Sequence, residues 1–92
     1  MASATIQIPS AFLGYTGGAS ELVVEAATVR EAVTQLTTRY PPLARHLLTP
    51  SGSLRAFVSV YLNGRDIRAL RLDATELSAG DALTIVPAVA GG

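Results

Sequence analysis

The residues with the most distinctive potential for chemistry in this chain are its last two, Gly91 and Gly92. Neither has a Cβ atom, so the backbone here meets little steric obstruction on entering a narrow active site. Residues 88–92 reach at most about 17 Å when extended, at roughly 3.3–3.6 Å per residue. A carboxylate on Gly92 is a poor electrophile, so acyl chemistry there requires activation, most simply adenylation by ATP on a partner enzyme. The same small-residue ending is also typical of an idle terminus.

The side chains offer little other chemistry. The chain has no cysteine and no lysine, which excludes thiolate metal sites, a nucleophilic thiol and Schiff-base formation on this protein. His46 is the single histidine, and no carboxylate lies near it in the sequence. The spacing of Asp73, Glu76 and Asp81 matches no calcium-binding loop, and turn or cap roles account for them better. We therefore expect no catalytic residue, no metal site and no bound cofactor.

Composition restricts the class of protein. With 92 residues, 49% of them hydrophobic and 15% charged, the chain predicts one small folded domain. Its formal net charge of zero argues against nucleic-acid binding. No apolar run approaches the ~18 residues that a membrane span needs, so no membrane partner is expected. Residues 1–5 lack the basic and apolar regions of a secretion signal, and we expect a cytoplasmic protein.

Two strands are predicted before residue 26. Residues 5–9 alternate polar and apolar side chains up to Pro9, and residues 21–25 form a second short run of the same kind. The glycine-rich segment between them predicts a long hairpin loop, so the strands should pair antiparallel. The side chains expected on the inner face are Ile6, Ile8, Leu22 and Val24.

A helix is predicted from Thr28. The segment from Thr28 to Glu31 matches a capping box, in which the hydroxyl and the carboxylate each satisfy a backbone amide of the first turn. Pro41 and Pro42 end the helix, because the residue before a proline is disfavoured in the α region. Apolar residues at helical spacing form the buried stripe: Val29, Ala32, Val33, Leu36 and Tyr40.

The second half of the chain predicts a hairpin and a final strand. Asn63 and Gly64 lie between apolar runs, which indicates a tight turn between a strand at 57–62 and a shorter return at 66–68. Residues 75–77 are expected to form a single turn before the last strand, 82–86. The side chains expected in the core are Val58, Val60, Leu62, Leu83 and Ile85.

The opposite face of these strands forms a semi-apolar surface. Period two places Phe57, Tyr61, Thr84 and Val86 outward, close to the C-terminal segment. Exposed apolar patches often dock partners, and we interpret this one as a partner-docking patch, with packing under a loop as the alternative. We expect the nearby arginines to form a merely solvated edge rather than a charged rim: Arg55, Arg65, Arg68 and Arg71.

The order of elements predicts an α+β fold. One long helix covers one face of a sheet, and at least one strand pair must be parallel, so a mixed sheet curled around one main helix is the economical arrangement. This is the β-grasp architecture of ubiquitin-like proteins, with the first and last strands side by side at the centre. We expect residues 1–87 to form this domain and residues 88–92 to form a flexible Gly-Gly tail.

The closing segment 80–92 resembles that of the MoaD/ThiS family of sulfur carriers, in which a Gly-Asp turn leads into the last strand, a proline and a terminal Gly-Gly. The resemblance extends in order over nearly the whole chain. It implies that an E1-like enzyme adenylates Gly92 with ATP and converts it to a thiocarboxylate, which donates sulfur to a biosynthetic enzyme. The tail residues that would enter the partner's active site are Ala88, Val89, Ala90 and Gly91.

A single proline at Pro87, rather than two in succession, is more similar to carriers that serve cysteine biosynthesis. In that branch the partners are a PLP-dependent cysteine synthase and a JAMM-type metalloprotease that releases the product. Thiamine, molybdopterin or specialised-metabolite thiolation remain alternatives. Two other functions also stay open: a ubiquitin-like modifier conjugated to lysines of other proteins, and an interaction module with an idle tail.

Overall fold

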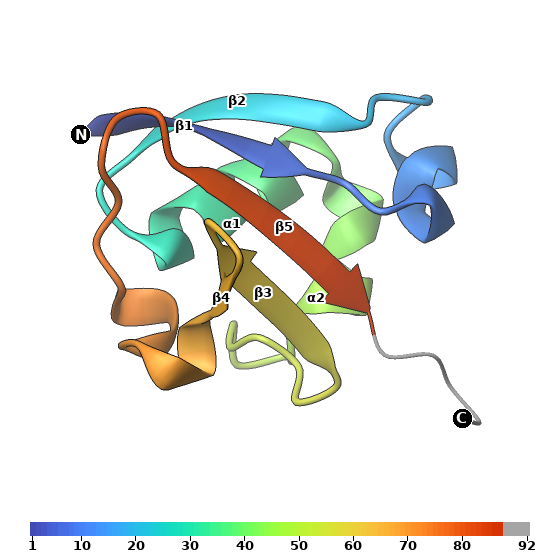
Figure 1. Cartoon of the computed structure of the whole chain (residues 1–92). Helices are drawn as coiled ribbons and strands as arrows, with labels where there is room; N and C mark the ends of the chain where they lie inside the picture. Colours follow the sequence, from blue (N-terminus) through green and yellow to red (C-terminus); the bar gives the residue numbers. More distant parts are fainter. Residues whose placement is uncertain (88–92) are drawn as a thin grey trace.

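The computed structural model describes residues 1–87. A five-stranded mixed sheet in the order β2-β1-β5-β3-β4 carries α1 (Val29–Arg39) and the short α2 (Ala44–Leu47) on one face (Figure 1). The strands are β1 (Ala2–Gln7), β2 (Glu21–Ala26), β3 (Val58–Leu62), β4 (Arg65–Asp66) and β5 (Ala82–Pro87). Four 3₁₀ turns connect them: η1 (Ser10–Tyr15), η2 (Pro41–Leu43), η3 (Ile67–Ala69) and η4 (Leu72–Ala74). The predicted α+β β-grasp fold is confirmed.

The pairing of the strands places β5 at the centre of the sheet. It lies parallel to β1, with Ile6 opposite Leu83, and antiparallel to β3, with Val60 opposite Ile85. The outer strand β2 pairs antiparallel with β1, as the hairpin prediction required. The predicted adjacency of the first and last strands is therefore confirmed.

The helix α1 begins with the predicted capping box, with one difference. The Thr28 hydroxyl accepts a hydrogen bond from the Glu31 N–H at 3.3 Å. The Glu31 carboxylate, however, accepts from the Ala27 N–H at 3.0 Å, one residue before the cap. The two residues together still satisfy two amides around the helix start, and Tyr40 ends the helix before Pro41.

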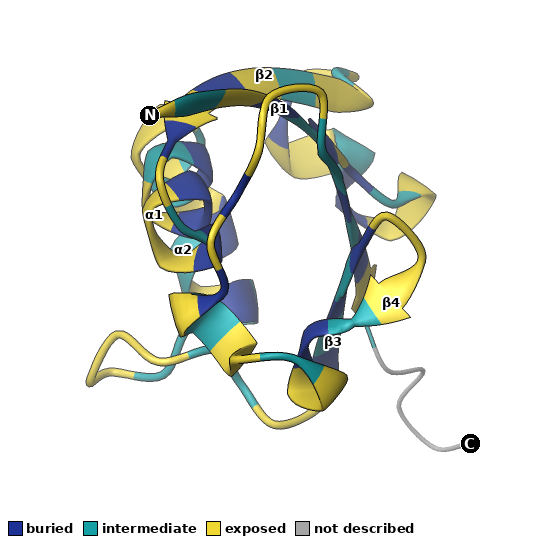
Figure 2. Ribbon diagram, turned by 60° about the vertical axis from the view of Figure 1, so that its left-hand side comes forward, coloured by how far each residue is buried: buried dark blue, intermediate teal, exposed yellow. Residues whose placement is uncertain are grey.

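The core lies between the helices and the sheet, where the buried residues of both layers face one another (Figure 2). Every side chain predicted for the inner strand faces is buried except Leu22, which is partly buried, whereas its neighbour Val23 is 65% exposed. In α1, Tyr40 is the one stripe residue that only borders the core. Phe12 from η1 also packs into this core, together with Leu43 and Leu47 from the segment after α1.

The prediction was wrong about the segment before β5. The turn is not at 75–77 but at η4, and Glu76 forms an isolated β-bridge with Thr28. The cause is the buried Thr75 hydroxyl, which donates to the Leu72 carbonyl at 2.7 Å and accepts from the Arg71 N–H at 3.0 Å. This tertiary arrangement has no periodic sequence signal.

A polar clasp fixes the start of β5. The Asp81 carboxylate accepts hydrogen bonds from the Ser78 N–H at 2.7 Å and the Asn63 side-chain amide at 2.9 Å. The Asn63 side-chain oxygen accepts from the Ala82 N–H at 2.9 Å. The Asp81 carbonyl accepts from the Thr5 N–H at 3.0 Å. The Gly-Asp turn thus joins β1, β5 and the β3–β4 hairpin.

Replacing the clasp carboxylate should destabilise the fold. Asp81→Ala leaves the Ser78 N–H and the Asn63 side-chain amide without their acceptor. We therefore expect the free energy of unfolding to fall by about 1–3 kcal/mol. Urea denaturation followed by circular dichroism measures the change. Glu21→Ala is the control, because Glu21 is exposed on β2, and it should shift the unfolding free energy by less than ~0.5 kcal/mol. Equal midpoints for the two variants would contradict a structural role for the clasp.

Candidate functional site

The register between β3 and β5 builds a surface on the face of the sheet away from the helices. Tyr61 lies opposite Thr84, and Ser59 lies opposite Val86. Directly opposed residues of an antiparallel pair point to the same face, with Cβ atoms about 4.5–5.5 Å apart. Three of the four residues predicted for the docking patch are therefore neighbours, on the face opposite to the buried Val58, Val60 and Leu62 with which they alternate.

The fourth predicted residue, Phe57, lies in the turn directly before β3. Its side chain is 55% exposed, and that of Val86 is 42% exposed. The guanidinium carbon of Arg55 lies 6.0 Å from the Phe57 ring centroid, at the limit of a cation–π contact. We call Phe57, Tyr61, Thr84 and Val86 the outer patch. It combines two exposed apolar side chains with a polar border, a composition that suits a protein partner.

Arg68 borders the outer patch from η3 and is not the merely solvated residue that we expected. Its Nη2 atom donates to the Ser59 hydroxyl at 2.6 Å and lies 3.0 Å from an oxygen of the Asp66 carboxylate. The Asp66 carboxylate also accepts from the Arg68 backbone N–H at 2.9 Å. The guanidinium hydrogen bonds, followed by this backbone bond, hold the pKa of Asp66 below its ordinary value.

The other edge of β5 is open near its end. Pairing with β1 stops at Gln7 and Thr84, and a groove lined partly by Pro9 and Pro87 lies beyond it. The Asn63 N–H donates to the Ala82 carbonyl. Backbone N–H and C=O groups alternate in direction along a strand, so those of Ala82, Thr84 and Val86 face β3. The backbone nitrogen of Pro87 therefore faces the groove. Both prolines lack an N–H, so the sheet ends at residues that cannot donate to a further strand.

The predicted reactive residue lies outside the described residues. This holds for Gly92 and for the four tail residues Ala88, Val89, Ala90 and Gly91. Their roles stay predictions, as does the division into a domain and a tail. β5 ends at Pro87, whose partner across the sheet is Val58, directly after Phe57 of the outer patch. The chain therefore leaves the sheet beside the surface built by the predicted docking residues.

His46, the single histidine, packs against two aromatic rings. The His46 ring packs 4.6 Å from the Tyr15 ring and 5.9 Å from the Phe12 ring, measured between centroids. This aromatic contact between η1 and α2 was not apparent from the sequence, because the three residues share no spacing pattern.

Across residues 1–87, no three side chains of the metal-ligating types come together. Among the same residues, no helix is both long and apolar enough to cross a bilayer.

The ion pair of Arg68 with Asp66, at the border of the outer patch, leads to a prediction about the pKa of Asp66. A carboxylate whose pKa is lowered by folding stabilises the folded state above its unfolded pKa, and this contribution is lost as pH falls through the folded pKa. Arg68→Gln should raise the pKa of Asp66 toward its ordinary value, measured by NMR titration of the side-chain carboxyl carbon. The backbone N–H of residue 68 remains, so the shift should be partial. Arg71→Gln serves as the control and should leave the pKa of Asp66 unchanged; equal effects of both variants would refute the assigned cause.

Comparison with known proteins identifies a matching family, similar sequences and similar solved structures. Residues 10–92 match the ThiS family. The sulfur carrier protein CysO of Mycobacterium tuberculosis is 36% identical over 90 residues, which cover 96% of this chain and 97% of that relative. A chain of the BexX/CysO complex from Amycolatopsis orientalis superposes with a TM-score of 0.87 and 35% identity, covering 97% of this chain and 99% of that one.

A further structural neighbour comes from an archaeon. Small archaeal modifier protein 1 of Methanosarcina acetivorans superposes with a TM-score of 0.90 and 26% identity, covering 100% of this chain and 98% of that one. These similarities span nearly the full sequence and include the strands that build the outer patch. The resemblance of segment 80–92 to the MoaD/ThiS family is confirmed. The chain belongs to the ThiS family.

Proposed function

We propose that this protein is a sulfur carrier whose Gly92 carboxylate is adenylated by an E1-like enzyme and converted to a thiocarboxylate. The observation that carries the proposal is the family match, which extends through residue 92 and includes the Gly-Gly ending. The relative that matches over 96% of the chain is named a sulfur carrier protein, and one that matches over 82% is named a putative sulfur carrier protein. They are protein cosubstrates, so the expectation that this chain is not itself an enzyme is confirmed.

The chemistry requires one activation and one displacement. A carboxylate oxygen of Gly92 attacks the α-phosphate of ATP, pyrophosphate leaves, and an acyl adenylate forms. A sulfide donor then attacks the carbonyl carbon, AMP leaves, and the thiocarboxylate remains on the chain. The protein has no cysteine, so its own side chains cannot carry the sulfur. ATP is a substrate of the activating enzyme, and we propose no cofactor held by this chain.

The domain contributes position rather than reactivity. β5 is paired on both sides at its start and still paired with β3 at Pro87, so the point at which the tail begins is fixed. From there, five extended residues reach at most about 17 Å. A partner that binds the outer patch would therefore hold Gly92 within a limited radius, which suits an active site at the end of a channel.

The sulfur acceptor is assigned by similarity. The relative CysO suggests cysteine biosynthesis, and we propose a PLP-dependent cysteine synthase as acceptor and a JAMM-type metalloprotease for release of the product. The CysO of Amycolatopsis orientalis occurs in a complex with BexX, which supports docking of this domain on a protein partner. Thiamine, molybdopterin or another thiolated metabolite would use the same carrier chemistry with a different acceptor.

The reactive residue can be tested by intact mass. Incubation with ATP, an E1-like enzyme and a sulfide donor should replace one oxygen by sulfur at residue 92. Deleting Gly92 should abolish this mass change and leave the thermal midpoint nearly unaltered. Gly14→Ala is a matched control, because a Cβ at Gly14 meets no atom within 4 Å and its φ is not positive. Sulfur incorporation in the deletion variant would refute the proposal.

The docking role of the outer patch can be tested separately. Val86→Thr keeps the β-branched shape but replaces an exposed methyl by a hydroxyl, so we expect KM for the activating enzyme to rise severalfold with kcat little changed. Val23→Thr is the matched control, because Val23 is 65% exposed on β2, away from β3. Equal KM values for the two variants would remove the outer patch from the interface.

A second function is favoured by the similarity to small archaeal modifier protein 1. A modifier would use the same activated carboxylate but transfer it to a lysine amine of another protein. Lysates that express the carrier distinguish the two functions: isopeptide adducts that resist reductant indicate a modifier, and free thiocarboxylate indicates a sulfur carrier. The absence of lysine from this chain rules out isopeptide chains of the protein linked to itself.

A further inference from the structure

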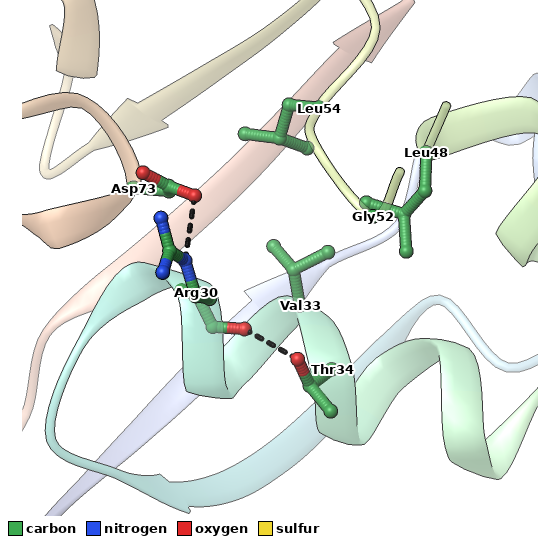
Figure 3. A pocket seen from close by; sticks show the side chains of 7 residues that line it. All are labelled: Arg30, Val33, Thr34, Leu48, Gly52, Leu54 and Asp73. Carbon is green, nitrogen blue, oxygen red and sulfur yellow. Dashed lines mark hydrogen bonds and ion pairs between the residues drawn. The ribbon is translucent and has the colours of Figure 1, made fainter. Parts of the chain in front are cut away.

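A second surface lies on the helix side of the molecule, around the loop between α2 and β3. Four adjoining hollows lie here; Leu54 lines three of them and Leu72 lines two, whereas the fourth is lined by Arg45, Leu48 and Arg55. In one of them, of about 20 Å³, Leu54, Leu48 and Val33 gather opposite the ion pair of Arg30 with Asp73 (Figure 3). We call this surface the leucine groove. The two hollows that Leu72 lines, of about 100 and 240 Å³, suit single side chains rather than a drug-sized cofactor, which needs roughly 300–1,000 Å³.

Leu72 has an unusual conformation for an apolar residue in solvent. Its side chain is 54% exposed, and its φ is +55°, in the left-handed region that disfavours residues with a Cβ. The buried Thr75 hydroxyl holds this conformation by its bonds to the Leu72 carbonyl and the Arg71 N–H. The Leu72 side chain is not among those that pack into the core. Leu72 instead presents this apolar side chain at the border of the groove, which is useful for binding.

The groove is also more basic than the rest of the chain. Four arginines and two aspartates line its hollows, although the whole chain has equal numbers of acidic and basic residues. Both aspartates are engaged, Asp73 by Arg30 and Asp66 by Arg68. Within residues 1–87, Arg45 and Arg55 line the groove without an ion pair, and the Arg55 Nε donates to the Arg45 carbonyl at 2.9 Å, which fixes its position. Arginine pairs well with carboxylates, so the excess charge favours an acidic ligand.

From these observations we propose that the leucine groove docks a short acidic segment of a partner protein that inserts an aliphatic side chain against Leu54 and Leu72. Its carboxylates pair with Arg45 and Arg55. No residue of the outer patch lines the hollows of the groove, although Arg55 and Arg68 border both surfaces, so this contact is additional to docking at the tail. It does not depend on the chemistry at Gly92.

The test is an NMR titration of the full-length, ¹⁵N-labelled protein with the synthetic peptide acetyl-Asp-Leu-Glu-Glu-Leu-Asp-amide. We expect saturable shifts confined to residues 44–56 and 66–74, which include both arginines and both leucines of the proposed contact. Leu72→Asn should weaken binding about tenfold, because it removes an apolar contact, while asparagine accepts the positive φ and preserves the fold. Val23→Thr, at an exposed valine on β2, is the matched control and should bind as the unmodified protein does.

Charge is tested by Arg55→Gln, which should weaken binding and reduce its dependence on ionic strength. A peptide with both leucines replaced by serine should lose the shifts. The proposal is overturned if the peptide causes no shifts, if the shifts fall on the outer patch, or if the serine peptide binds equally well. Sulfur incorporation at Gly92 is measured without peptide, so failure of either proposal is recognised independently of the other.

Discussion

The structure depends on the register of one strand. β5 enters the sheet between β1 and β3, and the hydrogen bonds of Asp81 with Asn63 and Thr5 determine where it begins. A slip of one residue would turn Leu83 and Ile85 from the core to the solvent, since side chains alternate between the two faces. A turn that belongs to neither the core nor the outer patch therefore fixes both. This gives a physical reason for the Gly-Asp pair that precedes the last strand.

The same register determines where the sheet stops. Pro87 is tolerated because its nitrogen faces the open side of β5, where β1 has already ended, rather than the ladder with β3. Pro9 lies across the groove and also lacks a donor. An exposed strand edge commonly recruits further strands, and two prolines at one place remove the donors that such pairing needs. The strand thus leads to the tail beside an edge protected from β-pairing.

Local patterns predicted most of this fold. Three of the predictions depend only on neighbours in the sequence, and each is confirmed: the alternation along Ile6 and Ile8, the cap at Thr28 and the turn at Asn63. The features that could not be predicted depend on residues distant in sequence or on backbone strain. Arg68 reaches Ser59 only because the β3–β4 hairpin folds back, and nothing in the residue type of Leu72 indicates a positive φ. The outer patch was predictable because it is a consequence of strand alternation; the leucine groove was not, because loops and turns build it.

The two proposed surfaces share β3 through the alternation of its side chains. Ser59 and Tyr61 face the outer patch, whereas Val58 and Val60 face the core and line one hollow of the leucine groove. Arg68 contacts both surfaces, since it lines that hollow and donates to Ser59. A carrier must be released by one partner and received by another, and a single binding face would force complete dissociation between the two steps. Surfaces on opposite sides of one strand allow a second protein to bind before the first has left, provided that the first leaves the groove free.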